Sequence, residues 1–346
     1  MLRFSGGTQN KLLPVLIALY LAAATFFVMS GLMIESKILP YPQRYSEGRE
    51  KAPYQNRILM IPVERLAYHS QTLARVASHR IGPFRDPGNY PVAVLGFLSI
   101  IGSGLLALNL YWKTTAKGSL GWLIYPAILM AVVATYTLHV VSNNLSLYDL
   151  PSMFLFTLGV WLAWERKFWW LVLLFPIATL NRETSLFLIP VAILMQKDDD
   201  TARLPEKRPL HRLEQFSQIV LMAVMWVVIT RLEKHYFPGV GSDETFTPLN
   251  NLRIMKNPVY WPNMLAATGF LWVIPAFGWR RIHNPRFRSL LLIFPLWLAV
   301  MLFRGGLSES RVFTELIPLT AVMAALVLEE PSLSTSPHQT LRTNKA

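Results

Sequence analysis

Charged residues border long apolar runs at several places in this sequence. Asp149 lies just before Pro151 and an apolar run, and Glu315 lies one turn inside the last apolar run. Arg182 and Glu183 separate two short apolar pieces. A charged side chain inside a membrane costs several kcal/mol unless it is paired or faces a water-filled cavity. These residues are therefore candidates for a functional site.

The candidate residues combine two kinds of chemistry. Arginine binds phosphate through parallel hydrogen bonds and stays charged when buried. A carboxylate beside it can take the proton of an acceptor hydroxyl while arginine neutralises a departing phosphate. We expect the catalytic carboxylate to be Asp149, Glu183 or Glu35. The predicted substrate-binding residues are Arg57, Asn181, Arg182, Arg304, Glu309, Arg311 and Glu315.

Some of these residues also have a purely structural interpretation. Arg311 and Glu315 are four apart, so on an α-helix they would share a face and form an ion pair. Asp149 before Pro151 fits a helix N-cap, and this role is compatible with chemistry. Glu35, at the end of the first apolar run, fits an interfacial anchor. Both kinds of interpretation stay open at this point.

Composition excludes several other functions. The chain has no cysteine, which excludes disulfides and thiolate metal sites. It contains no Walker A loop, dinucleotide-binding fingerprint, Gly-x-Ser-x-Gly elbow or zinc-ligand pattern. We therefore expect neither a metal nor a cofactor. The net charge of +13 comes from short basic segments between apolar runs, which indicates anionic membrane lipids rather than nucleic acid as the partner.

The bilayer is the expected solvent of this chain. Of its 346 residues, 53% are hydrophobic and 15% are charged, against about 25% charged in an average soluble domain. A helix needs about 20 apolar residues to cross a bilayer. The runs that fit are 12–34, 91–112, 120–141, 216–232, 261–279, 290–303 and 313–328, with shorter pieces at 151–164, 168–180 and 186–195.

The pieces 168–180 and 186–195 form either one bent crossing or a broken pair that meets at 181–185. The positive-inside rule favours the pair, because the short basic segments then fall on one side. These segments are the N-terminus with Arg3 and Lys11, Lys113/Lys117, Arg166/Lys167, 197–212, 280–288 and the tail with Arg342 and Lys345. We therefore expect an all-α polytopic membrane protein with about ten membrane helices, including short or broken segments. Both termini would be cytoplasmic.

We expect a single transmembrane helical domain over residues 1–330 and a disordered cytoplasmic tail over 331–346. The extracytoplasmic loop 35–90 is the longest between the predicted spans. Within it, apolar residues from Ile58 to Val76 alternate with polar ones such as Glu64 at roughly helical spacing. This pattern predicts an amphipathic helix lying on the membrane surface.

Three segments resemble a broad group of bacterial multispan proteins whose architecture is similar to that of GT-C glycosyltransferases. They are 148–151 (YDLP), 178–185 (ATLNRETS) and 309–318 (ESRVFTELIP). The resemblance implies a bacterial inner (plasma) membrane as the location and a polyprenyl-phosphate-linked sugar as donor, used at the extracytoplasmic face. It also implies an acidic motif in the first outer loop, where this chain offers only separated glutamates, of which Glu35 is the best placed.

Buried arginines and carboxylates by themselves suit a substrate with an anionic head and a hydrophobic tail. The expected function is therefore glycosyl transfer from such a donor to a glycan or lipid acceptor. Two alternatives stay open. One is a polysaccharide polymerase or ligase that acts on lipid-diphosphate glycans, and the other is a lipid or solute transporter, for which broken helices and buried charges are equally natural.

Overall fold

A computed structural model of the protein describes residues 9–39, 41–115, 118–137, 144–196, 208–241, 248–307 and 309–329. The tail predicted at 331–346 lies outside these ranges. The basic residues predicted for one membrane side at Arg3, Lys117 and 197–207 lie outside them as well.

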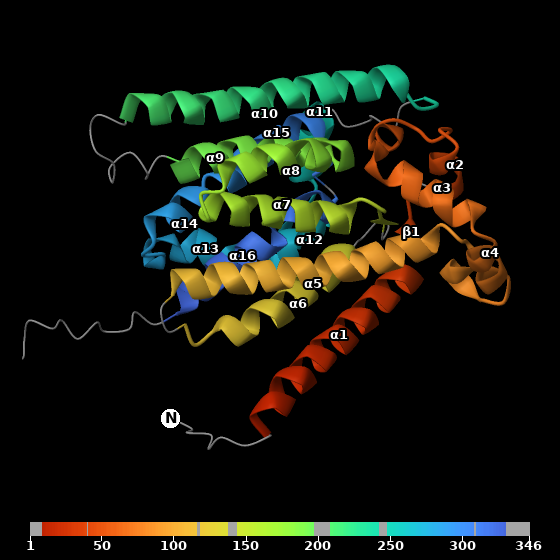
Figure 1. Ribbon diagram of the computed structural model, residues 1–346, viewed down its shortest axis with the longest axis horizontal. Coiled ribbons are helices and arrows are strands. Elements are labelled where there is room, and N and C mark those ends of the chain that lie inside the picture. Colours follow the sequence, from red (N-terminus) through yellow and green to blue (C-terminus); the bar gives the residue numbers. More distant parts are fainter. Residues whose placement is uncertain are drawn as a thin grey trace, which may run out of the picture.

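Helices make up nearly all of the described structure (Figure 1). The first half contains α1 (Gln9–Glu35), α2 (Pro42–Ser46), α3 (Ile61–His69), α4 (Gln71–Ser78), α5 (Asn89–Thr114), α6 (Gly121–Thr137), α7 (Asp149–Trp164), α8 (Phe168–Asn181) and α9 (Leu188–Gln196). The second half contains α10 (Arg208–Tyr236), α11 (Pro248–Lys256), α12 (Trp261–Leu265), α13 (Val273–Gly278), α14 (Pro285–Leu290), α15 (Ile293–Arg304) and α16 (Ile317–Leu328).

Short 3-10 helices and one small sheet connect these helices. The 3-10 helices are η1 (Tyr54–Asn56), η2 (Ile58–Met60), η3 (Gly82–Arg85), η4 (Glu183–Phe187), η7 (Pro258–Tyr260), η8 (Ala267–Phe270), η9 (Trp279–Arg281) and η10 (Ser310–Leu316). Strands β1 (Lys37–Ile38) and β2 (Asn144–Leu145) pair in parallel, with Lys37 opposite Asn144. This pairing ties the chain after α1 to the segment that leads into α7.

Five helical segments of the described chain are long and apolar enough to cross a membrane. They are Pro14–Glu35, Asn89–Thr114, Arg212–Tyr236, Pro285–Arg304 and Ser310–Leu328. Shorter apolar helices lie at Gly121–Thr137, Asp149–Trp164, Phe168–Asn181 and Glu183–Gln196. The segment Ser310–Leu328 is almost wholly buried, whereas Pro14–Glu35 and Arg212–Tyr236 are mostly exposed. The last apolar run therefore forms the centre of a helical bundle, and α1 and α10 lie at its periphery (Figure 1).

Small residues allow α5 to pack closely in this bundle. Gly96, Ser103, Gly104 and Ala107 are buried on one face of the helix, and α5 packs against α6, α7 and α16. A Cβ atom at Gly104 would overlap the ring of Tyr125 on α6. Small side chains at such spacing let helix backbones approach one another, as is typical of packing between membrane helices.

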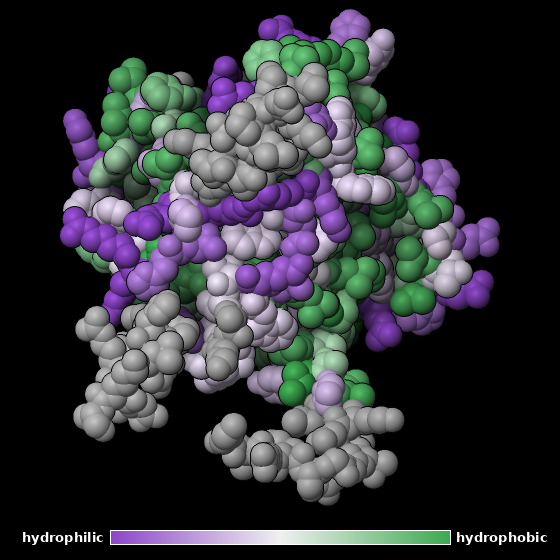
Figure 2. Space-filling model, turned by 60° about the vertical axis from the view of Figure 1, so that its left-hand side comes forward, coloured by the Kyte–Doolittle hydropathy of each residue, from purple (hydrophilic) through white to green (hydrophobic). Residues whose placement is uncertain are grey.

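The two ends of the bundle differ in chemistry. At one end, Lys113 at the end of α5 pairs with Glu165 after α7 at 2.5 Å, and the ring of Trp164 packs against Phe287 of α14. We call this end, which carries Lys113, Lys167 and Arg288, the basic end. Figure 2 turns the left side of Figure 1 forward and shows a band of hydrophilic side chains with hydrophobic ones on both sides.

The opposite end carries the segment between α1 and α5, residues 36–88, which we call the first loop. Here α2, α3, α4 and β1 lie together (Figure 1). The amphipathic helix predicted between Ile58 and Val76 is two helices, because the chain bends at Ser70, whose hydroxyl accepts a hydrogen bond from the N–H of Leu73 and starts α4. Glu64, predicted on a polar face, is fully buried instead.

The segment 168–196 is a broken pair, and the chain reverses at Arg182. Trp169 at the start of α8 donates to Glu214 of α10, and further along α10 the indole of Trp226 donates to the carbonyl of Glu183. The chain then returns, so that Gln196 at the end of α9 contacts Gln218 of α10. Successive contacts therefore run forward along α10 and then back, which a single bent crossing does not allow.

The helix predicted over 261–279 is interrupted, and this prediction was wrong. The backbone of Thr268 and Gly269 has φ values of 52° and 62°, outside the helical region. A Cβ atom at Gly269 would overlap Ala131 of α6. Glycine therefore fits at position 269, because it adopts positive φ without strain and leaves space for the Ala131 backbone.

Candidate functional site

Arg182 occupies the break between α8 and η4 with an extended backbone. Its Nη1 atom is 3.2 Å from Asp149 Oδ1 of α7 and 3.3 Å from Glu315 Oε1 of η10. The three side chains are almost completely buried. One arginine is thus shared between two carboxylates that come from different parts of the chain.

Arg311 contributes a second guanidinium to the same acid. Its Nη1 atom is 3.7 Å from Asp149 Oδ2, and its Nε donates to Glu309 Oε2 at 2.8 Å. The predicted Arg311–Glu315 ion pair does not form. Both residues lie in the 3-10 helix η10, whose turn contains about three residues rather than 3.6, so positions four apart point in different directions.

Asp149 is therefore the common acid of a buried network that we call the Asp149 network: Asp149, Arg182, Glu309, Arg311 and Glu315. Its side chain is not the N-cap of α7, because Tyr148 holds that position. The Asp149 carboxylate instead accepts a hydrogen bond from the N–H of Ser146 at 3.2 Å. The acid thus fixes the turn before α7 as well as both arginines.

Arg57 and Glu183 form a separate, more exposed pair beside this network. Arg57 Nε donates to Glu183 Oε2 at 3.1 Å and Arg57 Nη2 to Glu183 Oε1 at 2.8 Å, a bidentate arrangement. The Arg57 guanidinium lies 4.3 Å from the ring centre of Tyr148, and that of Arg182 lies 6.0 Å from it. The Glu183 side chain is 42% exposed, whereas that of Arg57 is 10% exposed. Glu183 is thus the carboxylate of the site that solvent reaches most easily.

The first loop holds Arg57 in place. The Tyr45 hydroxyl donates to the Arg57 carbonyl, and Gln55 donates to the Tyr45 carbonyl at 3.2 Å. Burial lowers the pKa of Arg57, but the Glu183 carboxylate more than offsets this, so the pKa lies well above its ordinary value. Arg57 is therefore charged.

Bulky side chains pack and hydrogen-bond with η10 and hold it against the bundle. The Trp297 indole of α15 donates to the Val312 carbonyl at 3.1 Å and stacks on Phe187 with ring centres 4.0 Å apart. The hydroxyls of Tyr136 and Thr314 are 3.1 Å apart. These contacts fix the direction in which Arg311 and Glu315 leave the backbone.

Three residues beside the site were not among the site residues predicted from the sequence. The hydroxyls of Ser152 and Thr184 each donate to Glu315 Oε1 at 2.6 Å, and Tyr148 lies between the arginines. Thr184 and Tyr148 lie in the segments 178–185 and 148–151, directly beside charged candidates. That position could have identified them from the sequence. Ser152 lies one turn after Asp149, on the same helix face.

Several buried polar atoms of the site have no hydrogen-bond partner among the described residues. They are Glu315 Oε2, Arg182 Nε, the Tyr148 hydroxyl and Asn181 Oδ1. Asn181, predicted to bind substrate, is fully buried and donates to the Tyr148 carbonyl at 3.1 Å. Its contact joins the end of α8 to the turn before α7.

The structure does not bring Glu35 and Arg304 into the site. Glu35 is exposed at the end of α1, and Arg304 is exposed at the end of α15. Within the described ranges, neither side chain forms an ion pair with the Asp149 network. Predictions that gave these residues roles beside Asp149 lack support from the geometry.

The arginines and carboxylates of the site nearly balance. Arg57, Arg182 and Arg311 face Asp149, Glu183, Glu309 and Glu315. In the part of the chain that the structure describes, no group of three or more His, Asp or Glu side chains is arranged to hold a metal ion. The chemistry that this arrangement offers is exchange of arginine partners and proton transfer to a carboxylate.

These features define a helical protein with membrane-length apolar helices and a charged site where a helix pair breaks. Comparisons with protein-family models, with curated proteins and with solved structures found no match to this chain.

Proposed function

We propose that the chain is a membrane glycosyltransferase similar in architecture to the GT-C class. Its donor would be a polyprenyl-phosphate-linked sugar and its acceptor a glycan or lipid. The observation that supports this proposal best is the bidentate Arg57–Glu183 pair, in which the Glu183 side chain is 42% exposed and the Arg57 guanidinium shares the Tyr148 ring with Arg182 of the buried Asp149 network. Arginine at the end of an apolar bundle suits a substrate with an anionic head and a hydrophobic tail.

In the proposed mechanism, the donor phosphate competes with Glu183 for Arg57. A carboxylate held by arginine is a weak base, because the positive charge favours the ionised form. When the phosphate takes the guanidinium, Glu183 regains proton affinity beside the reacting groups. The Asp149 network holds its own arginines on buried acids, so its role is to position the break that carries Glu183.

Sugar transfer forms one bond at the anomeric carbon and breaks another. The acceptor hydroxyl oxygen forms a bond to the anomeric carbon of the sugar, and its proton passes to Glu183. The bond from the anomeric carbon to the phosphate oxygen breaks, and polyprenyl phosphate departs with one more negative charge. Arg57 neutralises that charge at the moment when Glu183 loses its own.

We also propose a topology of about ten membrane segments in the bacterial plasma membrane, with both termini in the cytoplasm. The basic end would face the cytoplasm, in agreement with the positive-inside rule, and the site would open on the extracytoplasmic side. The helices α3 and α4 would lie at the membrane surface, where their exposed apolar residues, such as Leu66 and Val76, contact lipid.

The test is transfer of labelled sugar by purified protein in liposomes. The donor is a polyprenyl-phosphate sugar labelled in the sugar, and a bacterial envelope extract supplies the acceptors. We expect label to move to an acceptor with wild-type protein, and Glu183→Gln to lower the rate by roughly 10²–10⁴-fold, as loss of a general base does. Glu165→Gln, at the basic end, is the matched control and should stay active.

The same experiment separates the other functions. Donor that crosses the bilayer chemically unchanged would replace the proposal by transport. Transfer of a whole glycan from a lipid diphosphate, with no transfer from the monophosphate donor, would indicate a polymerase or ligase.

A further inference from the structure

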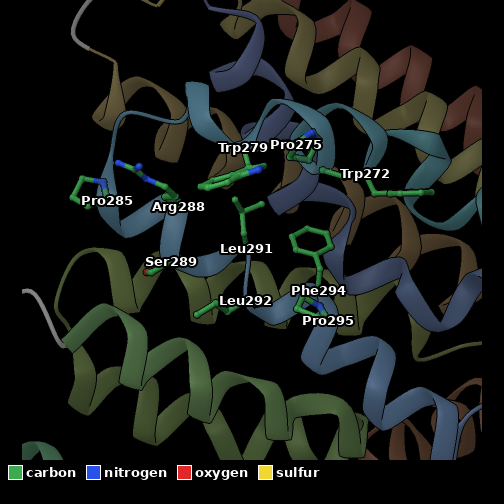
Figure 3. Close-up of a pocket in the computed structure, with 11 residues that line it drawn as sticks. Trp272, Pro275, Trp279, Pro285, Arg288, Ser289, Leu291, Leu292, Phe294 and Pro295 are labelled. Atoms are coloured by element: carbon green, nitrogen blue, oxygen red, sulfur yellow. The ribbon is translucent and has the colours of Figure 1, made fainter.

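An apolar groove of about 650 Å³ lies at the basic end, lined by residues between Trp272 and Pro295. In Figure 3, Trp272 and Trp279 border it on one side and Leu291 and Phe294 on the other. Arg288 lies at one end of the groove. We call this feature the Arg288 groove. Apart from Arg288 and Ser289, its lining is apolar.

The two ends of the groove differ in chemistry along the membrane-length segment Pro285–Arg304. Arg288 stands near the start of that segment, and Pro295, which also lines the groove, stands further into it. Arg288 therefore lies at the end of the groove nearer the start of the segment, which we call the mouth, and the apolar lining continues toward the middle of the segment.

The surroundings of Arg288 are rich in positive charge. The sequence contains no Asp or Glu between Glu244 and Glu309, and the same stretch contains Arg280, Arg281, Arg286 and Arg288. An anion beside Arg288 would thus meet a stretch of chain that supplies several arginines and no acid of its own.

Physical constraints narrow the occupant to an amphiphile. An apolar cavity does not hold water well, because a water molecule needs polar partners, and an empty cavity loses the dispersion contacts of its lining. A hydrocarbon chain makes dispersion contacts with the apolar lining, and a phosphate group accepts hydrogen bonds from arginine. Basic pockets between membrane helices on the cytoplasmic side bind anionic lipid headgroups in this way.

We propose that the Arg288 groove binds an anionic phospholipid, with an acyl chain along Leu291 and Phe294 and the phosphate on the Arg288 guanidinium. This inference requires membrane insertion and is independent of the transfer reaction proposed above. It assigns the lipid contact to one site rather than to the basic surface as a whole.

Quenching of tryptophan fluorescence by brominated lipid tests the proposal. The full-length protein is placed in phosphatidylcholine vesicles that contain a rising fraction of phosphatidylglycerol with brominated acyl chains. A variant carrying both Trp272→Phe and Trp279→Phe gives the signal of the other tryptophans, which is subtracted. We expect the remaining quenching to saturate at a low fraction of phosphatidylglycerol.

Two variants test separately the charge of Arg288 and the free volume of the groove. Arg288→Gln should raise the phosphatidylglycerol fraction needed for half-quenching about fivefold, the effect of removing one arginine from an anionic lipid surface. Ala276→Phe, which places a ring in the groove, should abolish the saturable quenching and tests the site even if Arg288→Gln fails to fold. Arg49→Gln, an exposed arginine in the first loop, should behave like wild type.

Brominated phosphatidylcholine that quenches Trp272 and Trp279 as strongly as the anionic lipid would overturn the proposal. An unchanged half-quenching fraction in folded Arg288→Gln would do so as well, because charge at the mouth would then play no part.

Discussion

Glu315 illustrates how the site depends on individual atoms. One of its carboxylate oxygens accepts hydrogen bonds from Ser152 and Thr184 and lies 3.3 Å from Arg182. Its other oxygen has no partner among the described residues. Buried ion pairs are weak sources of stability, but removing one member leaves an uncompensated charge at high cost. The network is therefore sensitive to loss of any one of its charges.

Replacing Arg182 by glutamine should destabilise the protein strongly. The change removes the counter-charge of Glu315 and one of the two arginines at Asp149, and such a loss costs about 3–5 kcal/mol. Thermal unfolding in detergent, followed by tryptophan fluorescence, should show a lower midpoint for Arg182→Gln. Arg49→Gln, whose side chain is 66% exposed beside Glu47, should unfold near the wild-type temperature. Equal midpoints for the two variants would contradict the buried network.

At the residue scale, the sequence identified several of the charged residues that meet in the structure, but not which of them pair. Arg182, Glu183, Arg311 and Glu315 stood out because they border apolar runs. The pairing of Arg311 with Asp149 instead of Glu315 depends on the 3-10 conformation of η10. That conformation is set by contacts such as the one between Trp297 and the Val312 carbonyl, which local sequence does not encode.

At the scale of elements, the reversal at Arg182 is the feature that creates the site. Two short helices, α8 and α9, reach into the bundle from the same end and leave polar backbone and side chains where they meet. Polar breaks of this kind are tolerated in a membrane only where protein or a cavity surrounds them. The polar motif at 181–185 indicated where an apolar run is interrupted, and the positive-inside rule favoured a broken pair over one bent crossing. The interruption at Thr268 and Gly269 had no such signal, since it depends on the approach of Ala131.

Thiol labelling can test the reversal directly, because the natural chain contains no cysteine. Single-cysteine variants Lys167→Cys, Glu183→Cys and Glu214→Cys are exposed to a membrane-impermeant maleimide in oriented vesicles. The reversal predicts that positions 167 and 214 react from one side and position 183 from the other. A single bent crossing would instead place positions 167 and 214 on opposite sides.

The first loop contains a buried acid that should make its stability depend on pH. Burial raises the pKa of Glu64 to about 8 from 4.5, and the Asp86 carboxylate adds to the shift. Both Glu64 oxygens lack hydrogen-bond partners among the described residues. The folded loop therefore keeps Glu64 protonated at a pH where the unfolded chain ionises it. Stability should be fully present below pH 4.5 and decline as the pH rises toward about 8.

Hydrogen exchange of the α3 amides between pH 5 and 9, corrected for intrinsic exchange rates, measures this effect. We expect protection in wild-type protein to fall with rising pH and protection in Glu64→Gln to stay nearly constant. Glu47→Gln, an exposed change in the same loop, should follow wild type. A Glu64→Gln variant with the wild-type pH dependence would refute the assignment.

At the scale of the whole molecule, two sites of different chemistry lie at opposite ends of the bundle. The basic end carries the Arg288 groove, and the opposite end carries the Arg57–Glu183 pair and the Asp149 network. The apolar composition and the approximate helix positions followed from the sequence, because the membrane requirement acts locally along the chain. The contact between Arg57 and Glu183 did not, since the residues are 126 positions apart and meet only when the first loop folds over the end of α8.

A double-mutant cycle on the sugar-transfer rate tests most directly whether Arg57 and Glu183 act together as the reactive pair. The rates of Arg57→Gln, Glu183→Gln and the variant with both changes are compared with wild type and with the Glu165→Gln control. Residues that act as a unit give strongly non-additive losses. The proposed mechanism predicts that each single change lowers the rate by at least about 100-fold and that the double variant is scarcely slower than the worse single one. Transfer by Glu183→Gln at the rate of Glu165→Gln would contradict it.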